Sequence, residues 1–139
     1  MGGVLALTSE RFNGAKAGLE YGANNTVSAD ATLGTAGEHY NLTASGGYTD
    51  TDGISAYAKG AEKDGFRQWH AQLRGEAELA SGLWVNAVGR YADSKVDFDG
   101  FPPPFYSFAD TPEYQTTKQG SGRLGLAYNS NALHLQGGI

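Results

Sequence analysis

Hydrophobic and polar residues alternate with a period of two along most of the chain. The window 69–79 shows this most clearly. Its odd positions are apolar or small (Trp69, Ala71, Leu73, Gly75, Ala77, Leu79), and its even positions are polar (His70, Gln72, Arg74, Glu76, Glu78). Successive side chains of a β-strand point to opposite faces, whereas a helix would scatter both sets around its circumference. The window therefore predicts a strand with one apolar and one polar face.

The same alternation recurs in six further windows. They cover residues 15–21, 27–33, 40–48, 83–91, 124–128 and 133–139. With their flanking residues, these windows predict strands of roughly 9–15 residues. Such strands are longer than the usual strand of a soluble protein and long enough, when tilted, to cross a bilayer. We therefore predict an all-β chain, an antiparallel meander of about seven long strands. It would form part of a transmembrane β-barrel, as a curved and unclosed sheet.

The expected connections differ in length. Turn-forming residues predict short connections at 35–38, 81–82 and 130–131,. Longer ones are predicted at 50–65 and 93–114, with a tight turn at Asn24-Asn25. Outer-membrane barrels have short periplasmic turns and long outer loops. Successive antiparallel strands run in opposite directions. If the first strand runs outward, all the short connections therefore lie on the inner side of the membrane.

Aromatic residues gather toward the ends of the expected strands. They are Phe12, Tyr21, Tyr40, Tyr48, Phe66, Trp69, Trp84, Tyr91 and Tyr128. Rings at headgroup level form the interfacial girdle of a membrane barrel. The alternative is ordinary packing between two sheets of a soluble sandwich. The runs between the aromatics are rich in Ala and Gly, which favours the girdle.

Composition and charge exclude several classes of protein. The mean hydropathy is −0.42, and no run approaches the roughly 18 apolar residues of a membrane helix. Spanning strands still fit, because they turn their polar residues toward a lumen. The net charge of −5 disfavours nucleic acid as a partner,. The absence of Cys removes disulfides and thiolate metal sites,.

Both ends of the sequence suggest a piece of a longer protein. The start lacks the basic region and long apolar core of a signal peptide. The last residue, Ile139, falls inside an alternating run. We therefore expect a fragment.

The chain opens on Gly2-Gly3-Val4-Leu5-Ala6-Leu7-Thr8, followed by the expected strand 12–22 and the Asn-Asn turn. These stretches resemble the TonB-dependent receptors of the bacterial outer membrane, in particular the cobalamin-transporter-like members. The first stretch is similar to the family's G-G-V-[IL]-x-[IL]-x sequence, which closes the plug domain. The stretches 48–53, 62–66, 90–94 and 97–101 resemble the first barrel hairpins. The resemblance implies that residues 1–10 end the plug. It implies that residues 11–139 are the N-terminal strands of an incomplete barrel.

The resemblance also implies a function and partners. The parent protein would be a receptor and transporter, not an enzyme, for energy-coupled uptake of a scarce nutrient such as a siderophore or cobalamin. Its partners would be outer-membrane lipid and lipopolysaccharide, the nutrient ligand, and the TonB complex, reached through an absent N-terminal region. Two alternatives stay open: a small outer-membrane barrel or adhesin, and a soluble β-protein that binds carbohydrate.

Two sets of residues are candidates for sites. In the proline- and aromatic-rich segment 101–108 and beside it, Asp99, Phe101, Phe105 and Tyr106 would grip a planar or hydrophobic ligand in an outer loop,. The alternative is a stiff loop tip that packs on its neighbours. The polar faces of the strands would line the lumen with Lys16, Glu20, Arg74, Glu76, Glu78 and Arg90.

We expect neither a catalytic centre nor a resident cofactor. Asp93, Asp97, Asp99 and Asp110 lie in or beside the longest expected loop, where carboxylates can bind calcium,. Solvated loop surface is the favoured interpretation, because the spacing of a calcium-binding loop is absent. The three histidines lie on different expected strands, so a metal centre is not predicted,.

Overall fold

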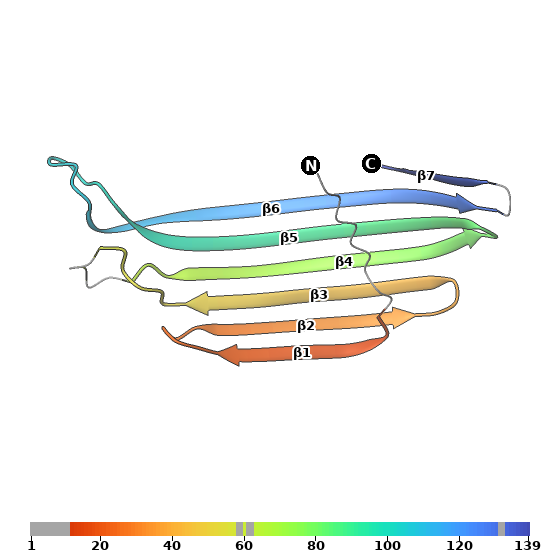
Figure 1. Ribbon diagram of the computed structural model, residues 1–139, viewed down its shortest axis with the longest axis horizontal. Coiled ribbons are helices and arrows are strands. Elements are labelled where there is room, and N and C mark those ends of the chain that lie inside the picture. Colours follow the sequence, from red (N-terminus) through yellow and green to blue (C-terminus); the bar gives the residue numbers. More distant parts are fainter. Residues whose placement is uncertain (1–11, 58–59, 61–62, 131–132) are drawn as a thin grey trace, which may run out of the picture.

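The computed structural model describes residues 12–57, 60, 63–130 and 133–139. The chain is all-β, as the alternation predicts. Seven antiparallel strands form one sheet in chain order, and the sheet is unclosed (Figure 1). The strands are β1 (Gly14–Tyr21), β2 (Val27–Ala36), β3 (Tyr40–Thr51), β4 (Phe66–Ala80), β5 (Leu83–Gly100), β6 (Ala109–Asn129) and β7 (His134–Gly138). The expected plug end, residues 1–10, lies outside the described part of the chain.

The connections alternate between two ends of the sheet (Figure 1). Residues 37–39, 81–82 and 130–133 connect strands at one end, which we call the short-turn end. Residues 22–26, 52–65 and 101–108 connect strands at the other end, the long-loop end. The sequence therefore predicted correctly which connections share an end. No helix in the described ranges is long and apolar enough to span a membrane.

Two turns show why particular residues occupy these connections. Asn24 and Asn25 have φ values of 55° and 53°, which match the central positions of the turn type that suits hairpins. Asn tolerates this left-handed region better than most residues. At the short-turn end, Gly82 has a φ of 77°, and a Cβ there would collide with the backbone carbonyl of Asn129.

The predicted loop 93–114 is wrong in extent. β5 continues to Gly100 and β6 begins at Ala109, so the connection is only 101–108. The two strands pair through this region, with Asp97 opposite Tyr114 and Phe98 opposite Glu113. Charged residues hid the strand pattern, because both faces of the hairpin carry polar groups here. Three aspartates assigned to the loop or its margins, Asp93, Asp97 and Asp99, therefore lie within β5, and Asp110 lies within β6.

The described residues form a single layer without an apolar core. None of their hydrophobic side chains is buried, whereas Asn41 is only 3% exposed and Asp99 only 8%. β3 shows the same inversion along one strand: Leu42, Ala44 and Tyr48 are exposed, while the polar residues between them are buried or half-buried. Soluble domains show the reverse distribution.

Candidate functional site

The strand register gathers most of the apolar residues of the long strands on one face. The exceptions include Phe66 of β4 and Trp84, Val88, Val96 and Phe98 of β5, which have the opposite parity. Leu33 of β2 lies opposite Ala44 of β3, which lies opposite Leu73 of β4. Leu73 continues the row to Gly89 of β5. We call this side of the sheet the apolar face. Its other large side chains include Leu19, Leu42, Val85, Leu124, Leu126 and Leu135. Leu73 itself is 55% exposed, so nothing in the described structure covers the centre of this face.

The opposite side, the polar face, carries the side chains of the other parity. Its central row runs from Lys16 in β1 to Ser121 in β6 through Thr32, Ser45, Gln72 and Arg90. The residues predicted to line a lumen, Lys16, Glu20, Arg74, Glu76, Glu78 and Arg90, all lie on this face. The structure therefore brings them together on one surface, although they come from three strands, β1, β4 and β5. What this surface faces stays a prediction.

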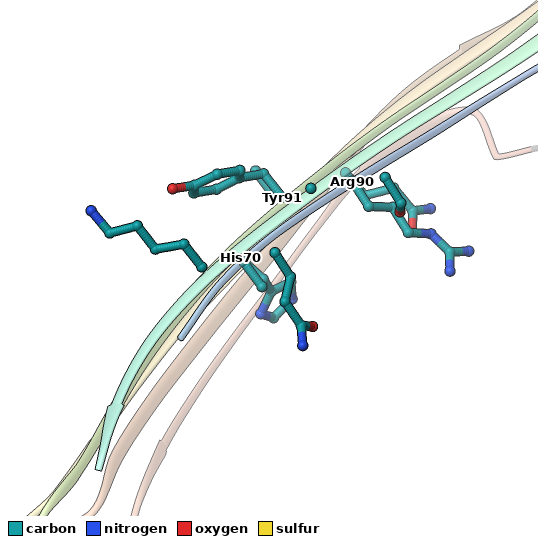
Figure 2. A pocket seen from close by; sticks show the side chains of 10 residues that line it. His70, Arg90 and Tyr91 are labelled. Atoms are coloured by element: carbon teal, nitrogen blue, oxygen red, sulfur yellow. The ribbon is translucent and has the colours of Figure 1, made fainter. Parts of the chain in front are cut away.

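The sheet is bent, and its two faces differ in curvature. Figure 2 shows the sheet nearly edge-on, with His70 and Arg90 on the inner side of the bend and Tyr91 on the outer side. The polar face is therefore concave and the apolar face convex. A hollow of about 660 Å³ is lined by residues of both faces, including these three. Because the sheet separates them, they do not enclose one compartment.

Aromatic side chains lie at two levels of the apolar face. Toward the long-loop end, Tyr48 lies directly opposite Trp69, and the rings of Trp69 and Tyr91 are 5.0 Å apart between centroids. Toward the short-turn end lie Tyr40 and Tyr128. Between these levels the face carries mainly Leu, Val, Ala and Gly. We call Tyr48, Trp69 and Tyr91 the aromatic belt.

Beyond the aromatic belt, the same face becomes charged. Arg67 lies 2.5 Å from Asp50, which also accepts a hydrogen bond of 2.8 Å from the Tyr48 hydroxyl. Further along, the ion pairs are Lys95–Asp97 at 2.8 Å and Lys118–Asp93 at 3.7 Å. The convex face thus passes from an apolar band through aromatic rings to paired charges.

Asp99 holds the 52–65 connection against the β5–β6 hairpin. Its carboxylate accepts hydrogen bonds from the backbone N–H of Tyr57 at 2.7 Å and of Thr111 at 3.3 Å. The Ser55 hydroxyl donates a third at 3.4 Å. Because Asp99 is nearly buried, these bonds are shielded from water and are stronger than on an open surface. This arrangement favours a positioning role for Asp99 rather than direct contact with a ligand.

The other three candidate ligand residues lie at or near the tip of the 101–108 connection. Phe105 is 86% exposed, and Tyr106 and Phe101 are also exposed. Phe101 contacts Phe108 at 5.4 Å between ring centroids, and Phe108 contacts Tyr57 edge-on at 6.0 Å. The rings nearest the sheet therefore support the loop, while Phe105 and Tyr106 are open to solvent.

Asp52, which directly follows β3, links two connections at the long-loop end. Lys63 donates a hydrogen bond of 2.8 Å to this carboxylate, and the Asn25 amide donates one of 2.7 Å. These two hydrogen bonds hold the pKa of Asp52 below its ordinary value, and the bond from Lys63 lowers the pKa more than the bond from Asn25 does. The charged carboxylate thereby connects the 22–26 turn to the 52–65 connection.

The acidic residues do not gather into a metal site in the described structure. No group of three or more Asp, Glu or His side chains there could hold a metal ion. Asp93 and Asp97 face lysines on the apolar face, whereas Asp99 binds backbone N–H groups.

Sequence reasoning did not single out three residues that take part in these arrangements. Ser55 and Tyr57 of the 52–65 connection donate hydrogen bonds to Asp99 of β5, and no periodic signal marks them. Arg123 lies on the polar face opposite Val88. The sequence could have predicted this, because Arg123 alternates with Leu124 and Leu126, which lie on the apolar face.

Comparison with known proteins gives no match: no family model fits the chain, and no curated protein or solved structure matches it.

Proposed function

We propose that this chain is part of the β-barrel of a TonB-dependent outer-membrane receptor, which takes up a scarce nutrient such as a siderophore or cobalamin. One observation carries the membrane part of this proposal. The convex face is apolar and exposed, while the concave face is polar and less exposed. A barrel in a bilayer needs this distribution, because its outer surface contacts lipid and its interior contacts water or a plug.

The dimensions of the apolar band agree with a bilayer. From Tyr40 to Tyr48, β3 covers roughly 27 Å at about 3.4 Å per residue. A tilt of about 40° reduces the height of this segment to roughly 20 Å. The apolar band of outer-membrane barrels is about 25 Å tall and is flanked by aromatic girdles. The aromatic belt would lie at the outer headgroups, and the paired charges beyond it would lie among lipopolysaccharide headgroups.

The direction of the strands supports an incomplete barrel. β1 and β7 run in the same direction, because each strand is antiparallel to the next. Direct closure of β1 on β7 would therefore create one parallel pair in an antiparallel sheet. Further strands of the parent protein would remove this conflict and pair both open edges.

The receptor part of the proposal rests on the resemblance of the hairpin stretches and on the concave polar face, which would line a lumen. Ligand capture would involve the exposed rings of Phe105 and Tyr106 at the long-loop end. Energy for release would come from the TonB complex through a plug that precedes these strands.

Tryptophan quenching tests the membrane assignment directly. Trp69 lies on the apolar face, and Trp84 has the opposite parity in β5. The chain would be folded into vesicles of ordinary or brominated phosphatidylcholine, with either Trp84→Phe or Trp69→Phe. Bromine quenches rings that contact acyl chains. We expect strong quenching when Trp69 is the remaining tryptophan and little when Trp84 remains.

Equal quenching of the two variants, or none, would refute the lipid-facing assignment. A monomer that stays soluble without detergent would favour the soluble carbohydrate-binding alternative. Heat-modifiable gel migration of this chain alone would favour a small complete barrel.

A further inference from the structure

Three arginines lie together on the concave polar face. Arg74 of β4 and Arg123 of β6 both lie directly opposite Val88 of β5, one on each side. Arg90 is two residues further along β5, so it is the diagonal neighbour of both. Diagonal neighbours across strands lie within reach of long side chains. The Arg123 side chain lies beside Gly138 of β7, and a rotation toward Arg90 would let one ligand contact all three guanidinium groups.

Among the described strand residues, none of the neighbours of Arg90 is acidic. Directly opposite it lie Gln72 and Ser121. The other two diagonal neighbours are His70 and Gln119, and Val88 and Ala92 flank Arg90 on the same face of β5. All of these neighbours are neutral or basic. Glu76 is the nearest carboxylate by register; it lies two residues beyond Arg74 and opposite neither Arg90 nor Arg123.

The three arginines lack the charge or ring partners that the other described cations have. Lys63, Arg67, Lys95 and Lys118 each form an ion pair with an aspartate. Lys16 lies over the Phe12 ring at 4.7 Å. Within the described residues, Arg74, Arg90 and Arg123 form no ion pair. Three positive charges on neighbouring strands without a nearby partner among the described residues give this part of the face a positive potential, which an anion would neutralise.

The local shape and chemistry also suit an anion. Val88, Arg90, Ser121, Gly122 and Arg123 line a shallow hollow of about 380 Å³, which is in the size range of small-molecule sites. Arg74 is not part of this lining, but it lies beside the hollow by register, across Val88 from Arg123. Guanidinium forks bind carboxylate and phosphate groups through paired hydrogen bonds. The Gln72 and Gln119 amides and the Ser121 hydroxyl would add neutral donors beside them.

We propose that Arg74, Arg90 and Arg123 form a binding site for a small molecule that carries several carboxylate or phosphate groups. The separation of the guanidinium groups over three strands suits several anionic groups better than one. Under the proposed function the concave face lines the lumen, and the anion would be the transported nutrient or part of it. This identification rests on the proposed function. The site itself depends only on the strand register.

Isothermal titration calorimetry of the whole chain, folded in a non-ionic detergent at low salt, tests the site. The probes are citrate and inorganic phosphate. We expect saturable binding that weakens as salt is added, and the tighter probe identifies the preferred group. Arg90→Gln should weaken binding by about tenfold or more, because charge-assisted hydrogen bonds are lost.

Arg67→Gln is the matched control, because Arg67 lies on the opposite face and pairs with Asp50. It should leave anion binding unchanged. Arg123→Gln provides a second variant, should Arg90→Gln fail to fold as judged by circular dichroism.

Absence of saturable heat with both anions would overturn the site, as would equal weakening by Arg67→Gln. Binding of hexaglutamate but of neither small anion would overturn it in favour of an acidic protein segment. The quenching experiment on Trp69 separates the two proposals. Quenching without anion binding refutes this site alone, whereas anion binding without quenching refutes the membrane assignment alone.

Discussion

Leu73 and Arg74 are consecutive residues of β4 that lie on opposite faces of the sheet. Leu73 lies opposite Ala44, on the convex apolar face. Arg74 lies opposite Thr43, on the concave polar face. If the two faces contact different solvents, substitutions at these neighbouring positions must have very different costs.

Leu73→Arg should destabilise the folded protein in lipid by about 2–4 kcal/mol, because it brings a charge to the middle of the apolar band. Arg74→Ala should cost far less, since it removes one half-buried side chain from the polar face and brings no charge into the apolar band. Denaturant unfolding from vesicles measures both. Equal costs would contradict the assignment of the faces.

Asp99→Ala should separate the 52–65 connection from the β5–β6 hairpin. The variant removes the acceptor of the Thr111 N–H and the shorter of the two hydrogen bonds of the Tyr57 N–H, which keeps only the Ser55 hydroxyl at 3.1 Å. We expect a cost of about 1–3 kcal/mol. Hydrogen exchange at the Tyr57 amide should become much faster. Asp97→Ala is the control, because it removes only the exposed pair with Lys95 and should cost at most about 1 kcal/mol. Unchanged protection of Tyr57 in Asp99→Ala would refute the link.

The contact of Asp52 with Asn25 and Lys63 should depend on pH. The folded pKa of Asp52 is lowered from its ordinary value of 3.8. Its contribution to stability is therefore present above that ordinary value and is lost as the pH falls through the lowered pKa. The Asn25 side-chain amide signal in NMR should titrate with a midpoint below 3.8. Asp52→Asn should abolish this titration, and a midpoint above 3.8 would contradict the predicted direction.

Gly82→Ala should destabilise the short-turn end by about 1–3 kcal/mol, because the positive φ is costly for Ala. The added Cβ would also clash with the backbone carbonyl oxygen of Asn129, so β6 would have to shift to accommodate it. Gly89→Ala is the control, since a Cβ there meets nothing within 4 Å. Thermal unfolding compares the two variants, and equal melting temperatures would argue against the turn geometry.

The alternation in 69–79 was sufficient to predict β4 and the facing of its residues. The alternation predicted a loop between 93 and 114, whereas β5 and β6 continue into this region and pair there through Asp97, Phe98 and their partners. Backbone hydrogen bonds extend that hairpin regardless of side-chain polarity, so a hydrophobicity pattern cannot mark its end. The turn residues Asn24, Asn25 and Gly82 were informative because their conformations demand particular residue types.

The candidate site was predictable only in part. Arg74 and Arg90 were assigned to the polar face by parity alone. Their proximity to Arg123 depends on the register of three strands, which parity does not specify. The burial of Asp99 likewise depends on how the 52–65 connection folds against the start of β6.

The sequence by itself determined that the chain forms long strands with two chemically different faces, because the side-chain period of a strand follows from backbone geometry. Tertiary structure alone decided which residues of different strands are neighbours. Register results from hydrogen bonds and turn geometry acting across the whole sheet, and it brings together Tyr48 with Trp69, Asp99 with Tyr57, and Arg90 with Arg74 and Arg123.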